Sequence, residues 1–217
     1  MKKILVVNDV ADCGRSYGYP FRDFAPCTND LNLIHEDPDS ILAAVFTGGS
    51  DVDPSLYGHS KYLGTFSDLR RDLQEQTICK RLIRLGVPLF GICRGSQFLC
   101  VMAGGTLVQH LNHHGGVLHD MLILGEDRTV EVNSTHHQMQ VPPSDAVVIG
   151  VAEPRLSKQY IYDGRVGFNP DYEYEVVCYP SINALGAQYH PEVMSNKSDG
   201  WNYYRELIKK HLEEDLV

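Results

Sequence analysis

The stretch "PLFGICRGSQFLCVMAGG", residues 88–105, decides the fold of this 217-residue chain. An apolar run leads into Gly91, Cys93 and Gly95, and helix-forming residues follow until two glycines end them. This order is typical of a buried strand that turns sharply into a helix at the edge of a parallel sheet, where ligands gather. Because a side chain on such a turn is held in an exposed position, Cys93 is a candidate nucleophile.

The helix that starts beside Cys93 gives a physical reason for a thiol at this position. Its first backbone N–H groups favour a thiolate and can also bind a developing oxyanion. Glycines flank the thiol because larger side chains would collide with the strand and with a substrate. A buried structural cysteine on a glycine-rich turn is equally compatible with this short pattern, whereas Cys100 on the same helix is interpreted as a core residue.

A second stretch, "GAQYHPEV" at residues 186–193, supplies a base and a group to orient it. His190 ends an apolar strand, and Glu192 follows two residues later. Alternation along an extended segment puts His190 and Glu192 on the same side. The carboxylate can then accept from one imidazole nitrogen while the other nitrogen faces a thiol. We therefore predict that Cys93, His190 and Glu192 are the catalytic residues.

The rest of the chain indicates one α/β domain that spans residues 1–217. Strand-like and helix-like segments alternate through the first half, which indicates a parallel sheet covered by helices on both faces. The second half is rich in strand-like segments, so we expect a mixed sheet. The chain shows no internal repeat, and its 43% hydrophobic residues suffice for a buried core.

Periodicity and end signals locate the individual elements. We predict helices over residues 67–86, 96–105 and 200–216, and strands over residues 2–8, 87–93, 128–134, 145–153, 174–180 and 184–190. Segment 40–54 fits either a helix end or a strand followed by a loop. In the first helix, apolar residues recur at roughly helical spacing at Leu69, Leu73, Ile78, Leu82 and Leu85.

Charge and cysteine usage narrow the partners and the compartment. The formal net charge of −9, without a long basic run, argues against a nucleic acid or an anionic membrane as partner. Asn8 and Asp9 interrupt the N-terminal apolar run too early for a signal peptide, and no apolar segment reaches the length of a membrane span. The six scattered cysteines contain no CxxC pair, so we expect reduced thiols and a cytoplasmic protein.

Four motifs together resemble a known family. "GICRGSQ" and "QYHPEV" are similar to the class I glutamine amidotransferases, whose members use a Cys-His-Glu triad. "FTGGSDVDPSLYG" and "VNSTHHQ" resemble the branch of γ-glutamyl hydrolases that act on γ-glutamyl-amine conjugates, such as γ-glutamyl-γ-aminobutyrate hydrolase. The resemblance runs from about residue 1 to residue 193. It implies a doubly wound, largely parallel, mixed sheet flanked by helices on both faces.

The resemblance also implies roles for individual residues. An oxyanion hole would be formed by the backbone N–H of Arg94 and that of Gly49, with Gly48 as the alternative to Gly49. Residues 133–138 would lie along the substrate. The substrate-binding positions implied in this way are Gly48, Gln97, Ser134, His137 and Gln138.

The function implied is hydrolysis of the γ-glutamyl amide bond of a small γ-glutamyl-amine conjugate or of glutamine. The reaction passes through a thioester, releases glutamate and an amine, and needs no cofactor. The alternative is a glutaminase subunit that delivers ammonia to a separate synthetase partner. A non-catalytic binding or regulatory relative would usually lack the cysteine or the histidine, and a general cysteine peptidase would need an extended groove.

Several features depart from the family or receive a structural interpretation. Ser50 stands where the family commonly has glycine or glutamate, and the chain is shorter between residues 116 and 128 and around 152–172, which leaves the amine open. The histidine-rich segment 110–119 is interpreted as a solvated or pocket-rim loop without a metal. The charged segments 67–72 and 209–215 are interpreted as solvated helix faces. We expect Trp201, Tyr203 and Tyr204 to dock the C-terminal helix on the core.

Overall fold

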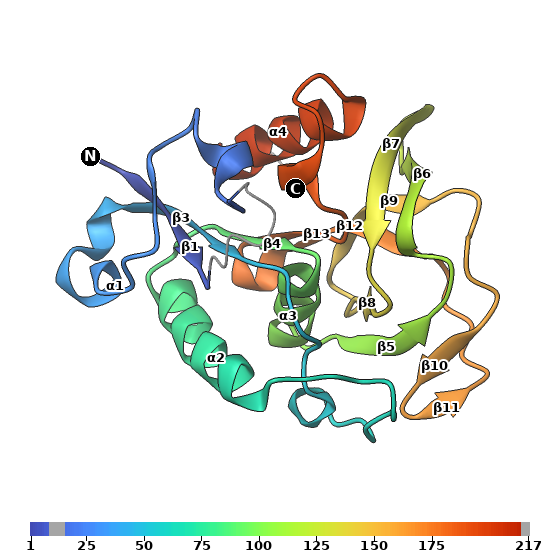
Figure 1. Cartoon of the computed structure of the whole chain (residues 1–217). Helices are drawn as coiled ribbons and strands as arrows, with labels where there is room; N and C mark the ends of the chain where they lie inside the picture. The colour runs from blue at the N-terminus through green and yellow to red at the C-terminus, as the bar shows by residue number, and fades with distance from the viewer. Residues whose placement is uncertain (9–15, 214–217) are drawn as a thin grey trace.

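A nine-stranded mixed sheet forms the centre of the protein in the computed structural model, which describes residues 1–8 and 16–213 (Figure 1). Its strands are β1 (Lys3–Val7), β2 (Cys27–Thr28), β3 (Ile41–Phe46), β4 (Leu89–Ile92), β6 (Gly115–Ile123), β7 (Arg128–Thr135), β9 (Val147–Ala152), β12 (Tyr174–Tyr179) and β13 (Ala184–Ala187). Their order is β2-β1-β3-β4-β13-β12-β9-β6-β7. Neighbours from β2 to β13 run parallel, and the remaining pairs are antiparallel, as predicted.

Helices cover both faces of this sheet. The α-helices are α1 (Leu33–Glu36), α2 (Leu69–Arg84), α3 (Arg94–Met102) and α4 (Asp199–Leu212). Short 3-10 helices are η1 (Tyr19–Phe21), η2 (Pro38–Ser40), η3 (Pro54–Leu56), η4 (Pro180–Ile182) and η5 (Pro191–Val193). Figure 1 shows α2 and α3 on one face and α4 on the other, and a separate apolar cluster fills each side. The predicted fold class is therefore confirmed.

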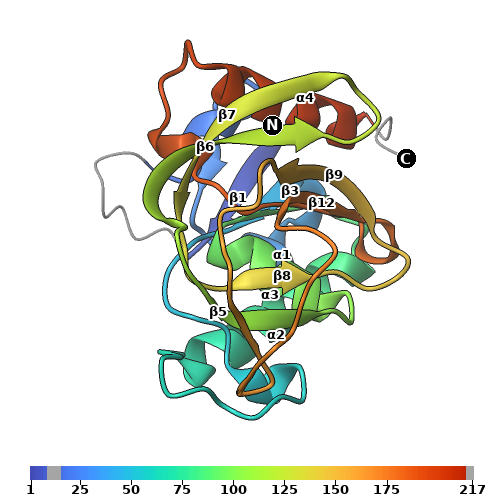
Figure 2. The ribbon, with the colours of Figure 1, turned by 90° about the vertical axis from the view of Figure 1, so that its right-hand side faces the viewer.

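A second, four-stranded sheet lies beside the main one. It consists of β5 (Thr106–Leu111), β8 (Met139–Val141), β10 (Tyr160–Tyr162) and β11 (Arg165–Val166), in the order β11-β10-β5-β8, with antiparallel neighbours. Figure 2 shows β5 and β8 between the β6–β7 hairpin and α2. Segment 134–141 leaves the main sheet at the end of β7 and enters this second sheet as β8, which contacts α3.

The interpretation of segment 110–119 as a solvated or pocket-rim loop was wrong in part, since residues 115–118 are exposed but belong to a strand. Its ends belong to β5 and β6, and the side chains of His114 and His119 are buried. β5 pairs with β8 and β10, while β6 pairs with β7 and β9, and all these partners come from later in the chain. Polar histidines at buried positions hide the alternation by which a strand is recognised, because they are satisfied by carboxylates far away in sequence.

Helix α2 turns a different face inwards from the predicted one. Leu69 and Leu73 are 42% and 50% exposed, whereas Asp72 and Glu75 are buried together with Cys79 and Leu82. The solvated reading of residues 67–72 was therefore wrong for Asp72. Carboxylates can occupy the inward stripe because a buried guanidinium from α3 pairs with them.

The C-terminal helix docks as predicted. Trp201, Tyr203 and Tyr204 of α4 are buried in the cluster that α4 forms with the sheet. Ser198 caps the helix, since its hydroxyl accepts from the backbone N–H of Trp201. Among the described residues, no helix combines the length and apolarity that a membrane crossing needs.

Candidate active site

Cys93 stands on a strained turn between β4 and α3. Its backbone N–H still donates to the carbonyl of Ala187 on β13 at 2.8 Å, so the strand pairing reaches this residue. The chain then turns with φ +53° and ψ −111° at Cys93, and α3 begins at Arg94. Positive φ at a non-glycine residue costs on the order of 1–3 kcal/mol, and such strain concentrates at functional sites. The geometry is that of a nucleophile elbow.

The two flanking glycines are required by close backbone packing. A Cβ on Gly91 would lie 2.5 Å from the carbonyl oxygen of Gly95. A Cβ on Gly95 would lie 2.0 Å from the carbonyl oxygen of Phe46, at the end of the neighbouring strand β3. The helix can therefore start directly against the strand ends only if both positions lack side chains.

His190 is fixed at the adjacent strand end by two residues. Its Nδ1 lies 2.7 Å from Oε1 of Glu192, which is buried. Asn133 on β7 accepts from the backbone N–H of His190 at 2.8 Å and donates to its carbonyl oxygen at 3.0 Å. Burial lowers the pKa of His190, but the charge and hydrogen bond of Cys93, together with Glu192, outweigh burial and raise this pKa well above its usual value.

A pocket of about 220 Å³ opens at Cys93. Among its lining residues are five that the sequence singled out: Gly49, Arg94, Gln97, His137 and Gln138. Gly48 lies on the side of His190, because a Cβ there would come within 3.4 Å of the imidazole Cε1. The structure therefore brings together the predicted residues from four separate segments of the chain.

The amide groups of the pocket residues Gln97 and Gln138 donate hydrogen bonds to neighbouring segments. Nε2 of Gln97 donates to the carbonyl of Gln138 at 2.9 Å and to Oε1 of Gln188 at 3.2 Å. Nε2 of Gln138 donates to the carbonyl of Gln109 at 3.4 Å, while its buried Oε1 has no partner among the described residues. The α3 helix is thereby tied to the segment 136–138, which also lines the pocket.

Asp51 is a pocket residue that the sequence reasoning missed. Its Oδ1 lies 3.0 Å from Nε2 of His137, and its Oδ2 accepts from the backbone N–H of Phe66 at 2.8 Å. The hydrogen bond that His137 donates to Asp51 raises the pKa of His137, although burial lowers it. The carboxylate lies two residues after the glycine pair, at the end of segment 40–54, where the sequence indicated only a loop.

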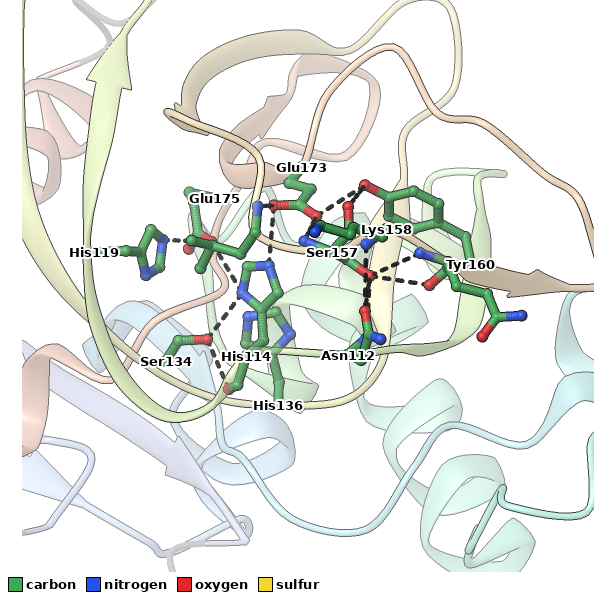
Figure 3. A network of polar contacts seen from close by, with 12 residues as sticks. Asn112, His114, His119, Ser134, His136, Ser157, Lys158, Tyr160, Glu173 and Glu175 are labelled. Carbon is green, nitrogen blue, oxygen red and sulfur yellow. Dashed lines mark hydrogen bonds and ion pairs between the residues drawn. The ribbon is translucent and has the colours of Figure 1, made fainter.

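Ser134 lies in a buried polar network next to the pocket (Figure 3). Its hydroxyl donates to the carbonyl of His114 at 2.9 Å and contacts Nδ1 of the same residue at 3.0 Å. His114 Nε2 lies 3.1 Å from Glu173, and His119 Nε2 lies 3.0 Å from Glu175. The substrate-binding role predicted for Ser134 would require its hydroxyl to leave this network.

Three members of the network have the composition of a metal site. Potential ligand atoms of His114, His119 and Glu175 lie within 4.8 Å of one another. The carboxylate of Glu175, from β12, could not be seen in the histidine-rich segment itself. Each imidazole already pairs with a carboxylate, and Glu173 also accepts from two backbone N–H groups of the 156–157 segment. Hydrogen bonding therefore accounts for most of this cluster without an ion.

Comparison with known proteins agrees with this geometry. The model of the peptidase C26 family matches residues 18–192. This chain belongs to the peptidase C26 family. The glutamine amidotransferase-like protein YvdE of Lactococcus lactis subsp. lactis is 34% identical over 169 residues, which cover 68% of this chain and 64% of that protein. The predicted resemblance is therefore confirmed.

Two further comparisons show which other proteins this peptidase C26 member is similar to in sequence or in fold. The chloroplastic carbamoyl phosphate synthase small chain of Arabidopsis thaliana is 29% identical over 124 residues, or 57% of this chain and 26% of that protein. The chain thus spans less than two thirds of the length of both relatives. A glutamine amidotransferase structure from Thermotoga maritima has a TM-score of 0.62 at 16% identity, with 100% of this chain and 86% of that chain covered, and it shares the fold.

Proposed function

We propose that this protein is a cysteine-dependent hydrolase of γ-glutamyl amides, with Cys93, His190 and Glu192 as its triad. It cleaves the C–N bond of a small γ-glutamyl-amine conjugate or of glutamine and releases glutamate and an amine. The observation that carries the proposal is the strained elbow at Cys93, whose sulfur raises the pKa of His190. In the proposed mechanism the pair reacts as thiolate and imidazolium, which is the reactive form of such a nucleophile.

Acylation follows from this ion pair. The Cys93 sulfur attacks the γ-carbonyl carbon, and the carbonyl electron pair moves onto oxygen. Backbone N–H groups of Arg94 and Gly49 donate to this oxyanion, and both residues line the pocket at the sulfur. The C–N bond then breaks as His190 donates its proton to the departing nitrogen, which leaves a γ-glutamyl thioester.

Deacylation uses the same groups in reverse. Neutral His190 takes a proton from water, and the water oxygen attacks the thioester carbonyl. The second tetrahedral intermediate expels the Cys93 thiolate and forms the γ-carboxyl group of glutamate. Glu192 remains ionised throughout and stabilises the imidazolium through Nδ1.

The pocket supports a small substrate. Its volume of about 220 Å³ lies below the roughly 300–1,000 Å³ that holds drug-sized ligands. Asp51, His137 and the Gln97 amide offer polar groups for an amino-acid head group. Phe66, a pocket residue that is 75% exposed, offers an apolar surface beside the pocket for the amine.

A second candidate function is the ammonia-delivering glutaminase subunit. Its specific support is the similarity to a carbamoyl phosphate synthase small chain, a protein whose name implies a partner chain. The same triad chemistry would operate, but the isolated protein would turn glutamine over slowly. The two functions therefore differ in what the lone chain hydrolyses.

Glutamate release from a substrate panel tests both candidates. Purified protein is incubated with glutamine and with γ-glutamyl conjugates of small, aromatic and carboxylate-bearing amines. A free-standing hydrolase prefers one of the bulkier conjugates over glutamine. A preference for glutamine at a low rate supports the subunit function, and no glutamate release from any substrate contradicts the hydrolase proposal.

A further inference from the structure

We propose that Glu75 and Arg71 of helix α2 are positioning residues that hold both oxyanion donors in register. The inference rests on the proposed function, since it concerns the oxyanion hole of that reaction. The two donors come from different segments, the loop after β3 and the start of α3, so their spacing has to be set by a third element. Helix α2 contacts both segments through charged side chains.

The first half of the link ends at Arg94, the residue after the nucleophile. Its side chain is buried beneath the elbow and pairs with Asp72 and Glu75. The guanidinium also lies over the ring of Phe98, 5.1 Å from its centroid. With both carboxylates on α2, these contacts fix the first residue of α3 and therefore the direction of its backbone N–H.

The second half of the link ends at the glycine loop. One nitrogen of Arg71, Nη2, donates to the carbonyls of Thr47 and Gly48 at 3.2 and 3.0 Å. The other, Nη1, lies so close to Gly49 that a Cβ there would approach it to 2.2 Å. Gly49 has φ +135°, a conformation that favours glycine. Arg71 therefore holds the glycine loop in place through the backbone carbonyl groups of Thr47 and Gly48.

Glu75 joins the two halves. Its Oε1 accepts from Nε of Arg71 at 2.8 Å and from Nδ2 of Asn8 at 2.7 Å, and its Oε2 accepts from Nη1 of Arg94. Glu75 is fully buried, so both carboxylate oxygens are used by protein donors. Together with Asp72, the cluster holds two positive and two negative charges and is neutral as a unit.

Such a link has a specific chemical consequence. Oxyanion donors act only if they point at the developing charge before the reaction starts, whereas formation of the thiolate depends on His190. Loosening the link should therefore slow acyl transfer without changing the nucleophilicity of the sulfur. A role limited to stability would change both together.

Arg71→Lys is the discriminating variant, and Arg70→Lys is its matched control. Lysine keeps the charge beside Glu75 but cannot span the two carbonyls and the carboxylate at once. Arg70 is the neighbouring, exposed arginine of the same helix. We expect R71K to lower kcat for amide hydrolysis roughly 10- to 100-fold with KM changed little, because loss of one oxyanion donor costs 10²–10³-fold.

The rate at which iodoacetamide alkylates Cys93 distinguishes the two roles. A role limited to stability would change this rate together with the rate of hydrolysis. This displacement develops no oxyanion, so R71K and R70K should be alkylated at the wild-type rate. Glu75→Asp, which keeps the charge and shortens the reach, should show the same separation of hydrolysis from alkylation if R71K does not fold. Folding of each variant is checked by circular dichroism and melting temperature.

The inference and the proposed function fail in different ways. If R71K and E75D hydrolyse at the R70K rate, or lose alkylation in proportion to hydrolysis, the positioning role is overturned while the hydrolase function stands. If the wild-type protein hydrolyses no γ-glutamyl amide, the function itself is contradicted. A fall in hydrolysis with unchanged alkylation supports both.

Discussion

Nδ1 of His190 lies 2.7 Å from Oε1 of Glu192, two residues further along the chain. The pair is formed where β13 ends and the 3-10 helix η5 begins, so the turn itself brings the carboxylate under the imidazole. A short bond from a buried carboxylate fixes the tautomer and the ring orientation. The other imidazole nitrogen is then available to Cys93, whose charge contributes to the raised pKa of His190.

Replacement of this carboxylate by its amide tests the orienting role. We predict that Glu192→Gln lowers kcat by roughly 10²–10⁴-fold, because the amide cannot stabilise the imidazolium and can favour the wrong tautomer. KM should change much less than kcat. Steady-state kinetics on the preferred γ-glutamyl amide measures the effect, and a variant with more than a tenth of wild-type kcat would contradict it.

The strained backbone at Cys93 predicts that the conformation needed for activity lowers the stability of the fold. Cys93→Ala should abolish hydrolysis while leaving the fold intact, since the methyl group fits where the thiol stood. Cys93→Gly should also be inactive but more stable than the alanine variant by about 1 kcal/mol, because glycine adopts positive φ without strain. Urea unfolding of both variants checks the difference. Hydrolysis at the wild-type rate by either variant would end the assignment of the nucleophile.

The titration of His190 should depend on the Cys93 sulfur. In the wild-type protein the pKa is raised, so the imidazole stays protonated to higher pH than a free histidine. In Cys93→Ala the contribution of the sulfur is lost, while burial still lowers the pKa and Glu192 still raises it, so His190 should lose its proton at lower pH than in the wild type. Imidazole ¹⁵N NMR follows this directly. Cys100→Ala, a buried cysteine of the same helix, is the control, and equal titration in wild type and Cys93→Ala would refute the ion pair.

Glycine packing at the elbow predicts a position-specific loss of stability. Gly95→Ala should destabilise the protein by roughly 2 kcal/mol or more, because its Cβ would meet the carbonyl oxygen of Phe46 at 2.0 Å. Gly115→Ala is the matched control, since no atom lies within 4 Å of a Cβ there. Its effect should stay within about 0.5 kcal/mol. Chemical denaturation compares the two, and similar losses would show that the elbow can relax.

The buried histidine cluster predicts a result for metal removal. Because His114 and His119 are already paired with Glu173 and Glu175, we expect dialysis against a chelator to leave hydrolysis and melting temperature unchanged. Metal analysis of the protein should find less than a tenth of an equivalent of zinc. Loss of activity or stability that zinc restores would instead assign a metal to the close group of His114, His119 and Glu175.

Features encoded by neighbouring residues could be predicted from the sequence. The strand, the glycine pair and the helix around Cys93 are adjacent in the chain, and so are His190 and Glu192. Local sterics and side-chain alternation suffice for such elements, because the atoms that decide them lie within a few residues. The order of strands and helices likewise pointed to a mixed α/β sheet.

Features that depend on distant partners could not be predicted in this way. Asp72 and Glu75 look like solvated charges until Arg94 is known to lie beneath the elbow. His114 and His119 look like loop residues until Glu173, just before β12, and Glu175, within β12, are known to lie beside them.

By itself, the sequence determined the parallel core, the elbow at Cys93 and the adjacent His190–Glu192 pair, because each follows from short-range backbone geometry. Only the tertiary structure decided which polar groups are buried, that Asp51 faces His137, and that Arg71 and Glu75 connect the glycine loop to α3. The physical reason is that burial of a charge is tolerated only beside an opposite charge, and here that charge comes from another part of the chain.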